Sequence, residues 1–126
     1  MVAAASRDHR VTGLGIDVEV ADGAFPGLDA VVLSDAERER SPVSVDGPAS
    51  LRSWVCKEAI LKAVGTGLAT DPREITLDGF AVAQGPEGPW SIHDLQLAEG
   101  VLGCLAVRGV DIASWSVAEV RYAPQT

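Results

Sequence analysis

The feature that most constrains the fold of this chain is a helical pattern over residues 50–64. Apolar side chains recur there with helical spacing, and two alanines add helix propensity. Gly65 is placed to end the helix in a left-handed turn. No other segment of the 126 residues carries as strong a helix signal, so the fold is expected to be built around it. The apolar positions are Leu51, Trp54, Val55, Leu61 and Val64.

Residues 11–20, upstream of this helix, have the pattern of a β-strand. Alternate side chains of a strand point to opposite faces, which places Asp17 and Glu19 together on one side and the apolar residues on the other. Gly13 and Gly15 allow another backbone to approach closely. Two carboxylates on one side of a strand are expected to face solvent or a functional site rather than the core.

The remaining chain predicts one further short helix and several strands. Ser34 and Glu37 have the spacing of a capping box, which predicts a helix from there to about Arg40. The almost wholly apolar run 101–107 suggests a central strand buried on both faces. We therefore expect an α+β fold, with one main helix packed on an antiparallel sheet. The other predicted strands are 75–77, 80–82, 90–97 and 114–122.

Composition narrows the class of protein further. The chain is 47% hydrophobic and 22% charged, which predicts a packed domain; we expect a tail at 1–10 and a single domain over 11–126. The net charge of −8 argues against nucleic-acid binding. No segment has the length of a membrane span or a signal peptide, and Cys56 and Cys104 lie in apolar segments without zinc-site spacing. We therefore expect a cytoplasmic protein with no membrane partner and two packed thiols.

Chemistry is suggested by two weak patterns that become stronger together. Glu58 and Lys62 are four residues apart on the predicted helix and share a face, which alone indicates an ion pair of about 0.2–0.5 kcal/mol. Asp17 and Glu19 alone would be ordinary solvated strand residues. Carboxylates from two elements with a lysine nearby are the groups needed to hold a divalent cation and a phosphate together.

The two segments resemble the signature of the 4′-phosphopantetheinyl transferase superfamily. That family carries a Gly-hydrophobic-Asp-x-Glu strand followed by a Trp-x-x-Lys-Glu-Ala/Ser-x-x-Lys helix and a Gly-x-Gly turn. Here the matching stretches begin at Gly15 and Trp54, and the turn begins at Gly65. The resemblance extends over about residues 11–122. It implies the family's fold, and transfer of the phosphopantetheine arm of coenzyme A to a serine of an apo acyl or peptidyl carrier protein, with release of adenosine 3′,5′-bisphosphate.

The resemblance also implies roles for the matched residues. Asp17, Glu19 and Glu58 would hold Mg²⁺, and three converging carboxylates would repel one another without it. Glu58 is the candidate general base for the serine hydroxyl, directly or through a metal-bound water. Lys62 would stabilise the charge that develops on the phosphates and on the leaving group.

Further coenzyme A contacts are implied at the matched positions. Lys57 is expected beside the phosphates with Lys62, and Gly65 and Gly67 form the turn next to them. No basic residue for the 3′-phosphate can be singled out by the motif. The arginines that remain candidates are Arg10, Arg38, Arg40, Arg52 and Arg73.

The sequence combines features of two types within that family. Its Asp-x-Glu strand and the Trp54 that begins its helix motif resemble the two-lobed type. Its length, and the Thr-Gly-Leu-Gly sequence that starts the strand at Thr12, resemble the small holo-acyl-carrier-protein synthase type. The small type builds its sites between subunits, so a homo-oligomer, with a trimer expected, is implied. Carrier proteins are acidic, and a basic patch at Arg38, Arg40 and Arg52 is the candidate docking surface.

Two other functions remain open from the sequence. The chain could be a non-catalytic subunit that binds carrier proteins or needs a partner lobe, or a magnesium-dependent phosphatase or nucleotide hydrolase that uses the same acidic groups. The presence of all three carboxylates and both lysines favours the transferase.

Overall fold

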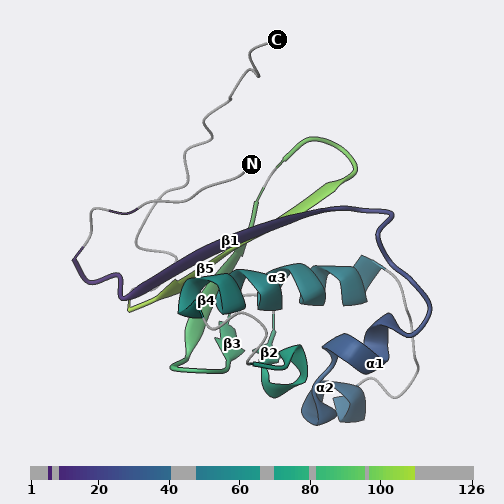
Figure 1. Cartoon of the computed structure of the whole chain (residues 1–126), viewed down its shortest axis with the longest axis horizontal. Coiled ribbons are helices and arrows are strands. Elements are labelled where there is room, and N and C mark those ends of the chain that lie inside the picture. Colours follow the sequence, from purple (N-terminus) through teal and green to yellow (C-terminus); the bar gives the residue numbers. More distant parts are fainter. Residues whose placement is uncertain are drawn as a thin grey trace.

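A five-stranded antiparallel sheet forms the framework of the protein (Figure 1). The structure is a computed structural model, and it describes residues 6, 9–40, 48–65, 70–79, 82–95 and 97–109. The spatial order of the strands is β1-β5-β4-β3-β2. The strands are β1 (Gly13–Val20), β2 (Thr76–Asp78), β3 (Val82–Gln84), β4 (Trp90–Asp94) and β5 (Val101–Arg108).

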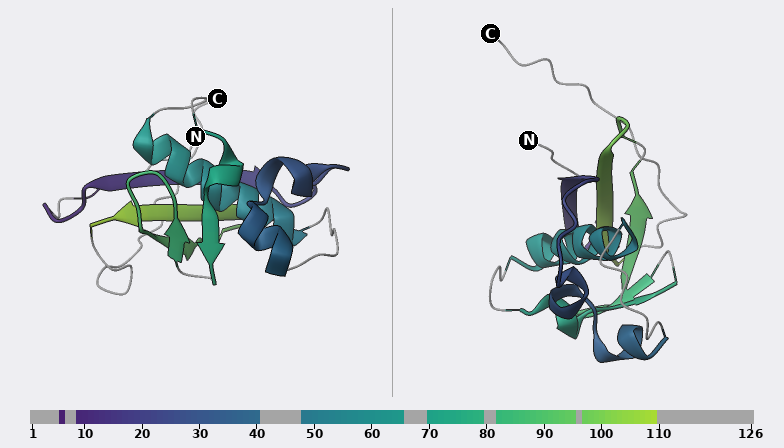
Figure 2. Two further views of the ribbon diagram at one scale, coloured as in Figure 1. Left: turned by 90° about the horizontal axis from the view of Figure 1, so that it is seen from below. Right: turned by 90° about the vertical axis from the view of Figure 1, so that its right-hand side faces the viewer.

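One long helix, α3 (Pro48–Val64), lies across one face of this sheet (Figures 1 and 2). The α+β architecture with one main helix on an antiparallel sheet is thus confirmed. Two short helices and a 3₁₀ turn lie beside it: α1 (Leu28–Val32), α2 (Asp35–Arg40) and η2 (Pro72–Glu74). Neither α1 nor η2 was expected from the sequence, because each is too short for a periodic apolar pattern.

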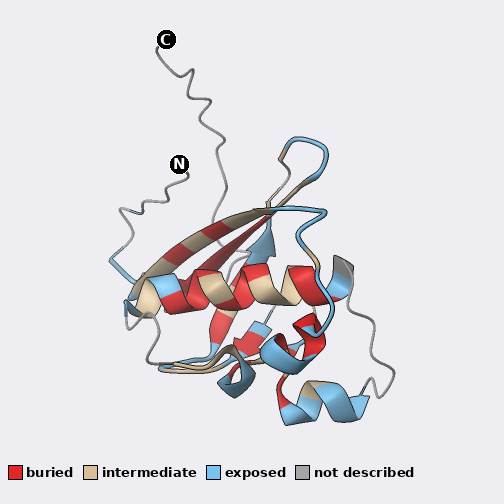
Figure 3. Ribbon diagram, turned by 45° about the vertical axis from the view of Figure 1, so that its right-hand side comes forward, coloured by how far each residue is buried: buried red, intermediate tan, exposed pale blue. Residues whose placement is uncertain are grey.

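The buried side of α3 forms the main core with the sheet (Figure 3). Val55, Ala59 and Ile60 are at most 1% exposed and pack with Trp90 and Ile92. The helix ends as its sequence predicts: Gly65 has a φ of 76°, and its amide donates to the Leu61 carbonyl over 3.0 Å. Removal of this apolar surface from water is the main force that holds the helix on the sheet.

Strand β5 is an interior strand of the sheet and is buried on both faces, as its apolar sequence predicts. It pairs with β1 on one side and β4 on the other, and residues 103–107 are all buried. Gly15, Asp17 and Glu19 of β1 lie on the face towards α3, because alternate residues share a face and Gly15 meets that helix. The opposite face of β1 ends at Val20, which is 56% exposed.

The capping box predicted at the start of α2 is confirmed. The Ser34 amide donates to Glu37 Oε1 over 2.9 Å, and the Glu37 amide donates to Ser34 Oγ over 3.3 Å. Glu37 also accepts a hydrogen bond from the Leu77 amide through Oε2, at 3.1 Å. One side chain thereby fixes α2 to strand β2.

Several expectations lie outside the described residues, among them the strand at 114–122, Gly67 and part of the strand at 80–82. In the part of the chain that is described, no helix is long and apolar enough to cross a membrane.

Candidate active site

The candidate site is created by an unusually close approach of β1 to α3. A Cβ atom on Gly15 would lie 1.9 Å from the Ala59 carbonyl oxygen and 2.8 Å from the Ala63 amide nitrogen. Only glycine permits this spacing, since real Cβ atoms do not approach other atoms so closely. The contact holds the following residue on the same face, Asp17, directly against the C-terminal half of the helix.

Asp17 is a buried carboxylate with an incomplete set of partners. It is 4% exposed, and its Oδ1 accepts a hydrogen bond from Lys62 Nζ at 2.5 Å. Its Oδ2 is buried and has no hydrogen-bond partner among the described residues. A buried carboxylate oxygen without a partner is costly, and such atoms in proteins often mark the place of a cation or ligand.

Glu58 and Glu19 complete the acidic face next to Asp17. The pKa of Glu58 is raised above that of an ordinary glutamate, first because the side chain is partly buried and second because of the charge on Asp17, with a smaller contribution from Glu19. The charges of Asp17 and Glu19 thus both act on the Glu58 carboxyl group. Among the described residues, however, no oxygens from all three lie within 4.8 Å of one another.

Lys62 contacts Asp17 and is also exposed to solvent. Its side chain is 55% exposed although its ammonium contacts the buried Asp17. The hydrogen bond to Asp17 and the neighbouring negative charges raise the pKa of Lys62, so it remains charged throughout the physiological range. An ammonium has three donors, and the hydrogen bond to Asp17 uses one of them.

Glu58 and Lys62 line a pocket of about 630 Å³. This volume lies within the range of small-molecule sites. The shared helix face predicted for these two residues is therefore part of the pocket wall. Trp54, Leu61 and Val31 supply apolar surface, and Gly65 lies at the end of the helix. The opposite wall is formed by Thr70, Asp71, Pro72, Arg73 and Glu74.

The wall around η2 carries a charged pair. Asp71 caps η2 by accepting a hydrogen bond from the Arg73 amide at 2.9 Å, and the Arg73 side chain donates to Asp71 Oδ2 at 2.6 Å. These hydrogen bonds from the Arg73 side chain and backbone lower the pKa of Asp71 to about 2. The sequence Asp-Pro-Arg-Glu is typical of a helix start and could have located this turn, but nothing in it indicated a place at the pocket.

Lys57 lies elsewhere. It is 0% exposed, and its Nζ donates to the Val32 carbonyl at 2.6 Å and to Glu37 Oε1 at 2.5 Å. Burial lowers the pKa of this lysine, while its hydrogen bond to Glu37 acts in the opposite direction. The structure therefore places Lys57 in the core and not among the pocket residues, in contrast to its expected position beside Lys62. Adjacent residues of a helix point in different directions, and this difference separates the two lysines.

The basic patch expected for docking is also partly engaged within the protein. Arg52 donates to Asp94, with Nε 3.0 Å from Oδ1, and its side chain is only 21% exposed. Arg40 donates to the Leu77 carbonyl at 3.1 Å. Arg38 is exposed on α2. The three arginines thus do not present a continuous set of free guanidinium groups.

The residues present at this site suit a hard divalent cation. Such ions prefer carboxylate oxygens, and within the described part of the chain Asp17 Oδ2 is a buried oxygen that lacks a partner. Glu19 is close enough to Glu58 for its charge to act on that side chain.

These features define a class of protein. It is a small α+β protein in which a buried carboxylate on a strand contacts a helix that carries a glutamate and a lysine. The sequence model of the 4′-phosphopantetheinyl transferase superfamily matches residues 13–105. The chain therefore belongs to this superfamily.

A solved structure has a similar fold. The holo-[acyl-carrier-protein] synthase of Thermotoga maritima matches with a TM-score of 0.57 at 18% sequence identity. The match covers 77% of the present chain and 62% of that chain, so the present chain spans about three fifths of its length. A search of curated proteins finds no match.

Proposed function

We propose that this protein transfers 4′-phosphopantetheine from coenzyme A to a serine of an apo acyl or peptidyl carrier protein. Membership of the superfamily supports this type of reaction. The observation that carries the proposal for this chain is the buried Asp17. Its Oδ2 has no partner among the described residues, and its Oδ1 is bound by Lys62, which lines the pocket together with Glu58.

Asp17, Glu19 and Glu58 would hold Mg²⁺. When bound, this ion supplies positive charge next to the phosphoryl oxygens of coenzyme A. The pKa of Glu58 is raised first by partial burial and second by the charge of Asp17, and such an ion would relieve the repulsion between these carboxylates.

Glu58 is the proposed general base. The serine hydroxyl of the carrier gives its proton to the Glu58 carboxylate while the serine oxygen forms a bond to the β-phosphorus of coenzyme A. The bond from that phosphorus to the bridging oxygen breaks, and adenosine 3′,5′-bisphosphate leaves with the electron pair. A base with a raised pKa accepts the proton more readily near neutral pH than an ordinary glutamate would.

Lys62 is proposed to bind the pyrophosphate. Its side chain reaches from the acidic face to the pocket, and two of its donors remain available beyond the bond to Asp17. Its fixed positive charge would stabilise the charge on the departing phosphate. Gly65 at the helix end leaves room beside it, since no atom lies within 4 Å of a Cβ built there.

Arg73 is the first choice among the arginines for the 3′-phosphate. Of the five candidates from the sequence, it is the one that lines the pocket in the described structure. Its guanidinium is 57% exposed and is held by Asp71. Arginine suits phosphate because its donors match two oxygens at once.

A homo-oligomer, with a trimer expected, is part of the proposal. Val31, which lines the pocket, is 44% exposed, and Phe25 and Val20 are 47% and 56% exposed. Exposed apolar groups are suited to contact with another subunit, and Val31 is the one of these three that lines the pocket. A neighbouring copy would then complete the pocket on this side. The protein is proposed to act in the cytoplasm.

The test is a transfer assay with coenzyme A, Mg²⁺ and a panel of apo carrier proteins, followed by mass spectrometry. A gain of one phosphopantetheine group on a carrier is expected, and it should be lost in Glu58→Gln. Binding of carriers without transfer would instead identify a non-catalytic subunit, and cleavage of coenzyme A without modification of a carrier would identify a hydrolase.

A further inference from the structure

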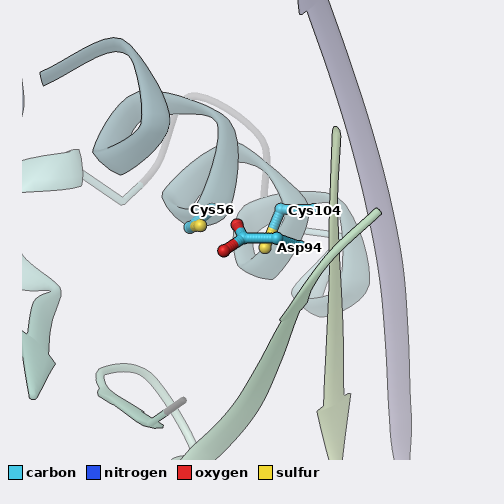
Figure 4. Close-up of side chains that lie close together, drawn as sticks. All are labelled: Cys56, Asp94 and Cys104. Atoms are coloured by element: carbon cyan, nitrogen blue, oxygen red, sulfur yellow. The ribbon is translucent and has the colours of Figure 1, made fainter. Parts of the chain in front are cut away.

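A second group of ligand-type side chains lies on the same face of the sheet, away from the pocket. Cys56 of α3, Cys104 of β5 and Asp94 of β4 point towards one another (Figure 4). One ligand atom from each lies within 4.8 Å of the other two. None of the three lines the pocket.

The fold brings these residues together through strand register and helix packing. Asp94 and Cys104 are direct partners in the β4–β5 pairing, so their side chains emerge on the same face. That face is covered by α3, which supplies Cys56 from above. Both cysteines are 0% exposed, whereas the Asp94 side chain is 47% exposed. The carboxylate is therefore the side of the cluster that solvent reaches.

The chemistry of the donors selects a type of ion. Two sulfurs and one carboxylate oxygen suit zinc and similar thiophilic ions rather than magnesium. Ligand atoms on a tetrahedral zinc lie about 3.5–3.8 Å apart, from bond lengths near 2.0–2.3 Å. Small side-chain rotations would bring the three groups from their present spacing to this one.

Arg52 orients the Asp94 carboxylate and could balance the charge of a loaded site. Arg52 Nε lies 3.0 and 3.1 Å from the two Asp94 oxygens, which holds the carboxylate near the thiols. Two thiolates, one carboxylate and one divalent ion have a net charge of −1, which the Arg52 guanidinium would balance. Outer partners that orient metal ligands in this way are a common part of metal sites.

The two thiols interact with each other and with one backbone group. The Cys104 thiol can donate to the Leu105 carbonyl oxygen, 3.7 Å away, and a hydrogen bond also links it to Cys56.

From this geometry we propose that Cys56, Cys104 and Asp94 form a binding site for a thiophilic divalent metal ion, zinc in type. The fourth coordination position would be taken by water at the Asp94 side. This site shares no ligand with the carboxylates proposed for magnesium, although Cys104 is the partner of Asp17 in the β1–β5 pairing and the two sites are therefore neighbours. The inference does not rest on the transferase activity, because the two are measured by different signals.

The test uses the full chain, reduced and freed of metal by a chelator, and titrated with Co²⁺ in the presence of excess Mg²⁺. Coordination by thiolates produces a sulfur-to-cobalt charge-transfer band, which carboxylate ligands cannot produce. We expect one equivalent of Co²⁺ to saturate this band and Zn²⁺ to abolish it by displacement.

Variants assign the signal to its ligands. Cys104→Ser and Cys56→Ser should each abolish the band, and they count only where circular dichroism shows the native fold. Asp94→Asn changes a half-exposed side chain, so we expect this variant to keep the native fold. It therefore tests the proposed site even if the cysteine variants do not fold. It should weaken Co²⁺ binding by at least the 10–100-fold that loss of an outer-shell partner causes. Asp78→Asn, an exposed carboxylate at the end of β2, is the matched control and should bind as the parent does.

Three outcomes would overturn the proposal. They are the absence of a charge-transfer band in the fully reduced protein, a band that persists unchanged in folded cysteine variants, and equal affinity in Asp94→Asn and the parent. Either of the first two would show that the two cysteines are only core packing residues, and the third would remove Asp94 from the proposed site; transfer to a carrier protein could still occur in each case.

Discussion

The Lys62 ammonium lies 2.5 Å from Asp17 Oδ1, although the two residues are 45 positions apart in the sequence. The contact joins the last turn of α3 to the middle of β1, and only the first of the two groups is exposed. Asp17 therefore has one cation on Oδ1 and a buried Oδ2 that none of the residues with a described position contacts by a hydrogen bond. This arrangement leads to the first prediction.

Lys62→Ala should make the stability of the protein more dependent on magnesium. Without the ammonium, the buried Asp17 carboxylate loses its cation, which should lower the free energy of unfolding by about 1–3 kcal/mol. Mg²⁺ would replace the lost charge, so thermal denaturation should show a larger Mg²⁺-induced rise in Tm than in the parent. Arg38→Ala removes an exposed cation on α2 and is the control. Equal Mg²⁺ shifts in the parent and in Lys62→Ala would argue against an ion at Asp17.

Glu58→Gln should separate activity from stability. Removal of a general base is expected to slow transfer by about 10²–10⁴-fold. The raised pKa of Glu58 means that the folded protein favours its protonated form. Its contribution to stability is therefore fully present below the unfolded pKa and is lost as pH rises through the folded pKa.

The neutral glutamine avoids this loss, so Glu58→Gln should be at least as stable as the parent at pH 7. Urea denaturation across pH 4–8 would measure it. In the parent, transfer should also fall on the acidic side at a pH above the ordinary glutamate range. A variant that is both inactive and strongly destabilised at pH 7 would contradict the electrostatic explanation.

Arg73→Gln should reveal whether this residue contacts the 3′-phosphate of coenzyme A. The KM for coenzyme A should rise while kcat changes little, because the contact lies away from the reacting phosphorus. With 3′-dephospho-coenzyme A, parent and variant should have similar KM values. The pKa of Asp71 should also return towards its ordinary value, since Arg73 lowers it. A KM increase of the same size with both substrates would indicate that another residue binds the 3′-phosphate.

Lys57→Met should destabilise the protein without a selective effect on coenzyme A. Removal of one partner of a buried ion pair typically costs about 3–5 kcal/mol, because the other charge remains buried. Glu37 is the partner here, and its side chain is 10% exposed. The double variant Lys57→Met with Glu37→Gln should recover part of the loss in a denaturant titration. A stable Lys57→Met protein with a high KM for coenzyme A would restore the role expected from the sequence.

Gly15→Ala should disturb the site through the backbone. The added methyl group would lie 1.9 Å from the Ala59 carbonyl, so β1 and α3 must separate. Overpacking of this kind costs about 1–3 kcal/mol, and Asp17 would move with its strand. Gly23→Ala, whose new Cβ meets its nearest atom at 3.1 Å, is the milder control. Unfolding midpoints and transfer rates of the two variants make the comparison.

The elements with a strong periodic pattern could be predicted from the sequence. The ends of α3 at Val64 and of β1 at Val20, the buried interior strand β5 and the capping box at Ser34 follow from spacing and apolar content, which local sequence determines, although α3 begins two residues earlier and β1 two residues later than predicted. The face shared by Glu58 and Lys62 followed from helix geometry alone.

What could not be predicted depends on contacts between distant segments. The burial of Lys57 against Glu37 requires the position of α2, which helix periodicity in α3 cannot give. The place of Arg73 at the pocket depends on how residues 70–74 return towards α3. The meeting of Cys56 with Cys104 depends on the register between β4 and β5 and on the helix above them.

The contact at Gly15 has a consequence for how this protein can change. The distance between β1 and α3 is set by main-chain atoms of the helix and not by side chains that could adapt. Residues around the pocket mouth can therefore be exchanged to suit another cosubstrate or carrier, while Asp17 keeps its position against the helix. Variation in specificity would then be concentrated around η2 and α1, with the strand–helix seam left untouched.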